Sequence, residues 1–482
     1  MLDIRPVGYV IGLLLLALGT TMLGPLLADL AAGNGHWWVF AEAAAITLAT
    51  GGLMALASAN GVKAGLTLRQ GFLLSSLVWL ILPAFGAIPF MLGATDARLV
   101  DALFEAMSGI TTTGSTVLTG LDDLPEGILL WRGILQWLGG IGIIVMAMVF
   151  LPELKVGGMQ VFRSEAFETM GKILPRAAEI ASRISVIYVG LTVACALSYM
   201  AIEMTPFDAV VHAMTTLSTG GMANTDASFQ EYGAGVHYVA VLFMFAAALP
   251  FVRYVQLMGG AAHPLFGDRQ IRVFGIVVLV AAGMLAAGQA SLNGALTELA
   301  WREALFNTVS IITGTGYASA DYMQWGPFAI TLIFVVGLIG GCAGSTSCSI
   351  KVFRYQILFG AIRAQIRLLH SPNGVFVVRF EGRPVAPDAM NSVMAFFVVF
   401  IVSLGIVAVL LSLTGLDFIT SISGAATALA NIGPGLGTEI GPTGNFAGLN
   451  DAAKWILTVA MFVGRLEMMV VLVLLTPQFW RD

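Results

Sequence analysis

Long apolar runs separated by short polar stretches dominate the chain. Ten of them are close to the roughly 20 apolar residues that a helix needs to cross a bilayer. Shorter apolar stretches of about ten residues lie between some of these runs, and they are too short to cross, which is typical of re-entrant segments. The pattern therefore predicts a membrane protein with ten spanning helices, near residues 7–30, 37–56, 71–92, 128–151, 184–204, 237–258, 273–293, 328–350, 390–413 and 452–475.

The basic residues predict how the chain is oriented. Most of the 23 Lys and Arg residues fall on the side of the N-terminus, which the positive-inside rule makes cytoplasmic, so we expect both termini there. The acidic residues favour the outer side. They either concentrate cations at an outer mouth or are merely unconstrained by topology. The first run is either a signal peptide or a helix; because its leading residues MLDIRP carry no net charge, we predict a retained helix.

Composition narrows the class of protein. Hydrophobic residues make up 58% of the chain and charged residues 11%, against roughly 25% charged in soluble domains. This excludes a soluble enzyme, a secreted disulfide scaffold and a disordered protein. The cysteines and histidines show no metal-site spacing, and HExxH is absent, so we predict no enzymatic activity. We expect membrane lipids, and no nucleic acid, as partners.

One sequence unit recurs four times. DALFEAMSGITTTGST (residues 101–116) returns as DAVVHAMTTLSTGGMA (208–223), as EALFNTVSIITGTGYA (303–318) and, more diverged, as TSISGAATALANIGPG (420–435). Each copy lies between two spans, so the unit is helix, half-helix, glycine turn, helix. Each unit returns to its starting side, so the four copies share one orientation around one axis. We predict an all-α polytopic membrane protein with four parallel helix–pore-loop–helix repeats around a central pore and two extra N-terminal helices, divided as 1–59, 60–176, 177–270, 271–371 and 372–482.

One glycine stands in register at the end of each half-helix. A single such glycine would be a helix C-cap or a close helix contact, but four in register favour loops that turn carbonyl oxygens toward the axis. The half-helix C-termini carry partial negative charge, which favours a cation. The predicted cation filter comprises Thr112, Thr113, Gly114, Ser115, Thr219, Gly220, Gly221, Met222, Gly314, Thr315, Gly316, Tyr317, Asn431, Ile432, Gly433 and Pro434.

These loops resemble the TrkH/KtrB superfamily of potassium uptake proteins, and the TrkH branch in particular. The resemblance covers nearly the whole chain. It implies translocation of potassium and rubidium across the bacterial inner membrane by a homodimer with one pore per protomer. It also implies a cytosolic TrkA-type ring that binds the regulatory nucleotide, so that this chain binds potassium as substrate and no cofactor. The motifs that carry it are SGITTTGS (108–115), LSTGGM (217–222), TGTGYASADY (313–322), NIGPGLG (431–437), WRGILQWLGGIGI (131–143), GGCAGST (340–346) and GRLE (464–467).

The resemblance further implies a gate below the filter. In the family, a loop interrupts the second helix of the third repeat, and an arginine lies in the pore beside it. The glycines and hydroxyl residues of 337–349 would indeed make a poor helix. This chain departs from the glycine-rich family pattern at residues 347–349, SCS, which we expect to stiffen the loop. The predicted gate comprises Gly340, Gly341, Gly344, Ser345, Thr346 and Arg465.

Several charged residues leave alternatives open. Arg465 is either an electrostatic gate or a structural bolt bonded to loop carbonyls; Glu467 lies two residues away on another helix face, so it is no simple local partner. Glu42 is either a polar contact or an ion site. His212 stands at the Glu105 position of the second unit and is either a sensor of outer pH or structural. Only Glu42 and Glu467 lie within spans, fewer acids than a carboxylate-coupled carrier needs, but coupling of potassium flux to protons or sodium stays an alternative.

Two inner loops, 153–183 and 351–370, are rich in Lys and Arg. Such clusters either only orient the chain or bind a partner. Because both loops are longer than a tight turn requires, we predict that they dock the cytosolic ring.

Overall fold

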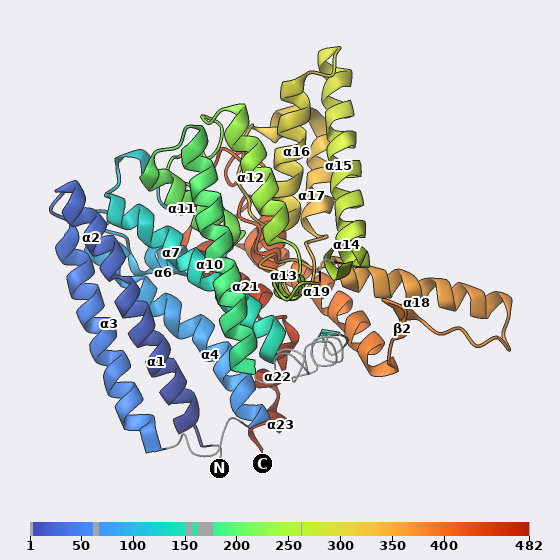
Figure 1. The fold of residues 1–482 in the computed structure, drawn as a ribbon, viewed down its shortest axis with the longest axis horizontal. Helices are drawn as coiled ribbons and strands as arrows, with labels where there is room; N and C mark the ends of the chain where they lie inside the picture. Colours follow the sequence, from blue (N-terminus) through green and yellow to red (C-terminus); the bar gives the residue numbers. More distant parts are fainter. Residues whose placement is uncertain are drawn as a thin grey trace.

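The computed structural model describes residues 3–60, 67–150, 157–159, 161, 177–261 and 263–481. Within these ranges the chain is almost entirely helical (Figure 1). The elements are α1 (Arg5–Thr21), α2 (Leu23–Ala32), α3 (Trp37–Ser58), α4 (Leu68–Gly86), α5 (Ile88–Leu92), α6 (Leu99–Ile110), η2 (Leu121–Asp123), α7 (Glu126–Val145), η3 (Met146–Phe150), α10 (Ala177–Ile202), α11 (Pro206–Leu217), α12 (Ala234–Ala247), α13 (Phe251–Met258), α14 (His263–Gly267), α15 (Arg269–Asn293), α16 (Glu298–Thr313), η4 (Tyr322–Trp325), α17 (Gly326–Gly337), α18 (Val352–His370), β1 (Arg379–Phe380), β2 (Arg383–Pro384), α19 (Pro387–Leu413), α20 (Phe418–Ala430), α21 (Asp451–Arg465), α22 (Met469–Leu475) and α23 (Pro477–Trp480).

Seven helices among the described residues are long and apolar enough to cross a membrane, or nine if each of two bent pairs is one span. Three of the ten predicted spans are therefore not continuous helices. The run 237–258 bends by 90° between α12 and α13, at Pro250, whose ring removes a backbone donor. The run 452–475 bends by 107° between α21 and α22, where Glu467 and Met468 have positive φ. The run 328–350 ends its helix at Gly337, as the glycine-rich sequence predicted.

The two N-terminal helical spans pack against each other and against the first repeat. A Cβ on Gly12 would lie 2.8 Å from the carbonyl oxygen of Gly51, so α1 and α3 touch backbone to backbone. The buried Asp29 carboxylate at the end of α2 accepts hydrogen bonds from the Gly127 N–H at 2.7 Å and from His36 Nδ1 at 2.9 Å. His36 Nε2 accepts from the backbone of Ala94, so the ring proton is on Nδ1. These bonds fix the extra helices to the start of α7.

The four half-helices α6, α11, α16 and α20 each lie between two other helices of their unit along the chain (Figure 1). The first and fourth units meet at one end of the molecule through charged side chains: Lys454 Nζ lies 2.6 Å from Asp101, and Arg98 lies 2.8 Å from Asp451. Since Asp101 and Asp451 begin α6 and α21, these pairs join units at opposite ends of the sequence. The boundaries assigned to the units stay a prediction.

One element projects from the helical body. Figure 1 shows α18 extending sideways from it, with the short hairpin of β1 and β2 beneath it. Both termini lie at the same end of the molecule, opposite to the turn between α2 and α3 (Figure 1). The long helices expose many large apolar side chains, Leu53, Leu242 and Ile401 among them, which suits a surface that faces lipid.

Candidate functional site

The four predicted filter loops have the same backbone conformation. In each, two residues separated by one position have positive φ, and the middle residue donates its N–H to a carbonyl five residues earlier in the half-helix, at 2.8 to 3.1 Å. This alternation lets successive carbonyls face one side of the loop. The positive φ values are Thr112 51° and Gly114 88°, Thr219 51° and Gly221 73°, Gly314 78° and Gly316 82°, and Asn431 51° and Gly433 108°.

The four register glycines meet in a closed cycle. A Cβ on Gly114 would overlap the carbonyl of Gly220, which precedes the glycine of the second loop. A Cβ on Gly221 would overlap the carbonyl of Thr315, and one on Gly316 that of Ile432. The cycle then closes, because a Cβ on Gly433 would lie 3.0 Å from the carbonyl oxygen of Thr113. The loops therefore surround one axis in the order one, two, three, four.

All four glycines line one cavity of about 340 Å³ that opens away from the half-helices. Ser115, Met222 and Pro434 line it too, together with the more polar residues Thr116, Asp226 and Arg132. This cavity is a mouth that leads onto the cycle of loops from one side.

Neighbouring side chains hold the carbonyls of the predicted filter loops in place. Gln136 on α7 donates to the Gly220 carbonyl at 2.7 Å and accepts from the Met222 N–H at 3.0 Å, so it brackets the second loop. Ser115 donates to the carbonyl of Gly433 at 2.7 Å, which links the first loop to the fourth. A carbonyl has two lone pairs, so each still has one to offer. The fourth loop, with Asn431 where the first two have threonine, donates from that side chain to Thr113 Oγ1 at 2.9 Å.

A second repeated contact supports the outer part of each loop. Glu105, His212 and Asn307 occupy the same half-helix position, and each accepts from the backbone N–H three residues after its register glycine, at 3.0, 3.4 and 3.3 Å. The fourth unit has Gly424 at this position. Its neighbour Ser423 makes the equivalent contact instead, because Ser423 Oγ accepts from the Leu436 N–H at 2.9 Å. The other ring nitrogen of His212, Nδ1, forms a hydrogen bond with the backbone carbonyl of Asp208. Both ring nitrogens of this histidine therefore contact the backbone.

Arg132 joins the first two loops behind the filter. Its Nε lies 2.8 Å from Glu105, its Nη1 donates to the Ala223 carbonyl at 2.8 Å, and both ionic side chains are buried. Tyr317, a predicted filter residue, points its hydroxyl away from the cycle toward Thr215 and Thr216. Its side chain therefore braces the third loop against the second half-helix.

Below the filter, residues 338–351 form a compact buried loop between α17 and α18. The N–H of Cys342 donates to the Ala248 carbonyl at 3.0 Å, and Thr346 Oγ1 donates to the Ala247 carbonyl at 3.0 Å. The carbonyl of Gly344 accepts from the Phe251 N–H at 2.9 Å. The loop is thus docked on the break between α12 and α13, whose free carbonyls and N–H groups it uses.

Cys348 is the loop residue nearest to the filter. Its sulfur lies 3.8 Å from Thr112 Oγ1 in the first loop, and its Cβ lies 3.7 Å from the Cβ position of Gly314 in the third. The first and third loops are diagonal partners in the cycle, so Cys348 lies at the axis. Arg465, the last residue of α21, donates to the Cys348 sulfur and, at 3.3 Å, to the Gly139 carbonyl.

The predicted gate residues therefore fall into two groups that make different contacts. Arg465 meets the loop through Cys348, whereas the hydrogen bonds of Gly341, Gly344, Ser345 and Thr346 fold or dock the loop. The sequence had singled out the SCS departure but assigned Cys348 no contact. Cys195, Cys342 and Cys348 are buried free thiols.

Glu467 pairs with Arg354 rather than with Arg465. Arg354 is fully buried, donates to the carbonyls of Gly157 and Ile350 at 2.9 Å each, and lies over the ring of Phe396. Every part of its guanidinium has a partner. Glu42 lies exposed on α3.

Comparison with known proteins agrees with this arrangement. A family model, TrkH, described as "Cation transport protein", matches residues 36–481. The chain belongs to the TrkH family. It is 44% identical to the "Trk system potassium uptake protein TrkI" of Halomonas elongata, over 99% of this chain and 97% of that protein. It is 35% identical to the "Trk system potassium uptake protein TrkH" of Escherichia coli, over 99% of both.

A solved structure of a family member has the same fold. The crystal structure of the potassium transporter TrkH from Vibrio parahaemolyticus superposes with a TM-score of 0.90 at 32% identity, over 100% of both chains. The predicted family and fold class are confirmed. As a TrkH protein the chain is a membrane transport protein and not an enzyme.

The buried pair of Arg132 and Glu105 gives a stability prediction. Arg132→Met leaves a buried carboxylate without its cation, which costs about 3–5 kcal/mol, so the melting temperature of the purified protein falls. Replacing both residues by Met removes both buried charges, and we expect it to recover part of that loss. Thermal unfolding of the wild type, both single variants and the double variant tests this. A double variant less stable than either single one would contradict it.

Proposed function

We propose that this chain carries potassium, and rubidium, across the bacterial inner membrane through a backbone-carbonyl filter that a loop and a pore arginine gate. The observation that carries the proposal is the closed cycle of four loops, in which each register glycine touches the next loop. The named relatives are potassium uptake proteins, and the four half-helices suit a cation at the centre of the cycle.

The filter atoms suit a large, weakly hydrated cation. Carbonyl rings replace the hydration shell of such an ion. Only one glycine is common to all four loops, and the carbonyls of Gly220 and Gly433 also accept side-chain hydrogen bonds. We therefore infer a preference for potassium and rubidium over sodium that is smaller than in a channel with four identical filter strands.

The gate assignment rests on the contrast between two arginines. Arg354 has its charge neutralised by Glu467 and its donors satisfied. Arg465 has a sulfur and one carbonyl as acceptors, and its Nε has no hydrogen-bond partner among the described residues. Its charge therefore acts on an ion at the axis. Two unit charges about 6 Å apart at an effective dielectric constant of about 20 repel by ~3 kcal/mol, about a hundredfold in rate.

A proton- or sodium-coupled carrier is the alternative to a gated channel. Such coupling by carboxylates needs acids that titrate within the pathway. Glu467 is paired with Arg354 and Glu42 is exposed on an outer helix, which favours the channel.

The projecting helix α18 supports the proposed partners, a second copy of this chain and a cytosolic nucleotide-binding ring of the TrkA type. One stripe of the helix exposes apolar side chains at heptad-like spacing: Phe359, Ile362, Ile366 and Leu369. Such a stripe suits a homodimer contact.

Arg363 and Arg367 lie exposed between the apolar residues of this stripe, and they suit contact with the cytosolic ring. Lys155, Arg163, Lys172 and Arg176, from the other predicted docking loop, lie outside the described residues. Both termini lie together at one end of the molecule (Figure 1), and we infer that this end is cytoplasmic.

The filter generates the first functional prediction. Gly221→Ser or Gly316→Ser places a side chain against a carbonyl of the next loop, which displaces that carbonyl and reduces discrimination between potassium and sodium several-fold. Gly405→Ser on α19, where a Cβ meets nothing within 4 Å, is the control. Currents from proteoliposomes under potassium and sodium gradients measure the selectivity.

Unchanged selectivity in both filter variants would count against the filter. In the wild type the reversal potential is expected to follow the potassium gradient, with only the sodium contribution that the measured permeability ratio gives, and to be independent of pH. A shift with an imposed pH gradient, or a sodium-dependent shift larger than that ratio allows, would favour the coupled carrier.

The two arginines give the second functional prediction. Arg465→Ala removes the uncompensated charge, so we expect faster potassium flux, by up to about a hundredfold, with wild-type abundance and melting temperature. Arg354→Ala leaves Glu467 buried without its cation and is expected to lower the melting temperature instead. Flux per molecule and thermal unfolding of both variants decide the matter. A lower melting temperature of the Arg465→Ala protein, without faster potassium flux, would show that Arg465 has a structural role and is not a gate.

Helix α18 gives the third functional prediction. Arg363→Glu with Arg367→Glu is expected to abolish co-purification of the nucleotide-binding ring and to leave the homodimer intact. Ile362→Glu with Ile366→Glu is expected to yield monomers, because it buries charge in the dimer contact. Pull-down and light scattering of the purified variants test this; retention of the ring by the arginine double variant would refute the docking site.

A further inference from the structure

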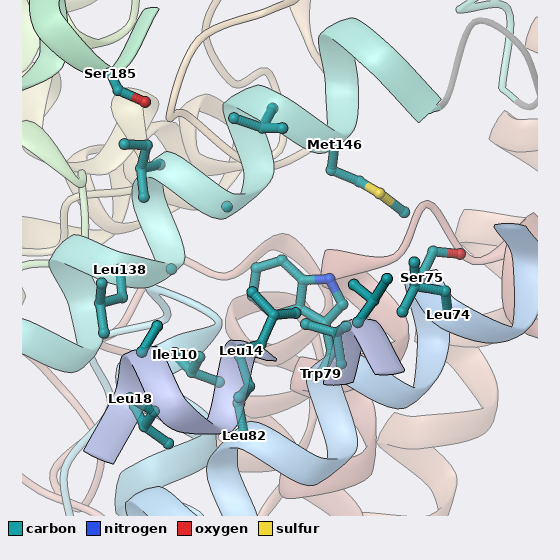
Figure 2. Close-up of a pocket in the computed structure, with 17 residues that line it drawn as sticks. Leu14, Leu18, Leu74, Ser75, Trp79, Leu82, Ile110, Leu138, Met146 and Ser185 are labelled. Carbon is teal, nitrogen blue, oxygen red and sulfur yellow. The ribbon is translucent and has the colours of Figure 1, made fainter. Parts of the chain in front are cut away.

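A cavity outside the ion path reaches from the membrane-facing surface to the base of the filter. Its volume is about 410 Å³, within the roughly 300–1,000 Å³ of small-ligand pockets. Its walls come from α1, α4 and α7, with Ile110 at the end of α6 and Ser185 of α10 closing two sides. Figure 2 shows the indole of Trp79 lying across its centre, with Leu14, Leu82 and Ile110 around it.

The chemistry of this cavity fits a hydrocarbon chain. The side chains that line it are apolar except for the hydroxyls of Ser75 and Ser185 and the indole N–H of Trp79, and no charged residue is among them. Ser75 Oγ already donates to the carbonyl of Phe72 in its own helix, at 2.9 Å. Apolar cavities of this kind stay dry and take apolar ligands.

The position of the cavity identifies the source of that chain. The helices α1, α4, α7 and α10 around it all belong to candidate membrane spans, and two lining residues, Ala17 and Gly142, are exposed at the surface. The same helices expose Leu13, Leu80, Val186 and Val189. At this depth of a bilayer the surrounding solvent is lipid tail.

The inner end of the cavity touches the gate. Trp79, which lines the cavity, also contacts Arg465, whose guanidinium carbon is 5.4 Å from the centre of the indole ring, within cation–π distance. Gly139, another lining residue, supplies the carbonyl that accepts from Arg465 at 3.3 Å. Two of the three groups that hold Arg465 are thus also walls of the cavity.

We propose that this cavity binds one acyl chain of a membrane phospholipid, which braces Trp79 against Arg465 and thereby favours the closed gate. Without an acyl chain packed against it, the Trp79 side chain is free to move within the cavity, and Arg465 loses its aromatic contact. The binding of the chain stands on the cavity alone, whereas the bracing rests on the proposed function of Arg465.

Gly142 offers a direct test. A Cβ there would lie 4.0 Å from two carbons of the Trp79 ring, so Gly142→Leu places a permanent side chain in the cavity. Gly283→Leu on α15, where a Cβ meets nothing within 4 Å, is the matched control. Wild type and both variants are reconstituted in phosphatidylethanolamine and phosphatidylglycerol vesicles that contain a phospholipid with a photoactivatable diazirine in mid-chain. After illumination, mass spectrometry locates the adducts.

We expect adducts on lining residues such as Leu14, Val78 and Leu138 in the wild type and in Gly283→Leu, and their loss in Gly142→Leu. Adducts confined to outward-facing residues such as Leu13 and Leu80, or equal labelling of the cavity in Gly142→Leu, would overturn the lipid site. Cross-links to a second copy of the chain in place of lipid would overturn it too.

The bracing has its own readout in the same vesicles. Rubidium flux through Gly142→Leu is expected to be several-fold lower than through the wild type and Gly283→Leu, because the filler holds Trp79 permanently. Lipid adducts together with unchanged flux would overturn the bracing. Absence of rubidium flux from every variant would overturn the proposed function and leave the lipid site standing, since the adducts are measured without transport.

Discussion

Four peptide loops approach one axis so closely that no side chain fits between them. At three of the four contacts, a Cβ on the register glycine would overlap a carbonyl of the next loop, so the cycle exists only with glycine at those positions. Much of the surrounding structure holds this contact. Gln136, Ser115 and Asn431 tie the loops to one another or to α7, and the pair of Arg132 and Glu105 supports them from behind.

The parts of this arrangement that repeat in the sequence could be predicted from it. The half-helices, the register glycines and the common orientation of the units follow from four copies of one unit, because a loop that needs positive φ selects glycine at the same position of each copy. The glycine-rich stretch after Gly337 likewise indicated an interrupted helix. Such features depend on the local backbone preferences of particular residues, and these can be predicted from a single sequence.

The contacts that occur only once could not be predicted. The bends at residues 248–250 and 466–468 lie inside apolar runs, where hydropathy gives no sign of a break, although Pro250 marks one of them. The pairing of Arg354 with Glu467, and the place of Cys348 at the axis, join segments far apart in the chain. Tertiary packing determines these contacts, and neither the spacing of residues nor the composition of the chain predicts that packing.

The four units are joined in one chain, and among the described residues it is the third unit whose second helix gives way to the buried loop 338–351, which meets the fourth unit's Arg465 through Cys348. A pore assembled from four identical subunits would have four copies of any gate, and its opening would be a concerted or stepwise change of all four. Under the proposed function, each pore has one gating loop and one gating charge. We therefore expect its opening to be one elementary transition, with a simple exponential time course and no cooperativity within the protomer.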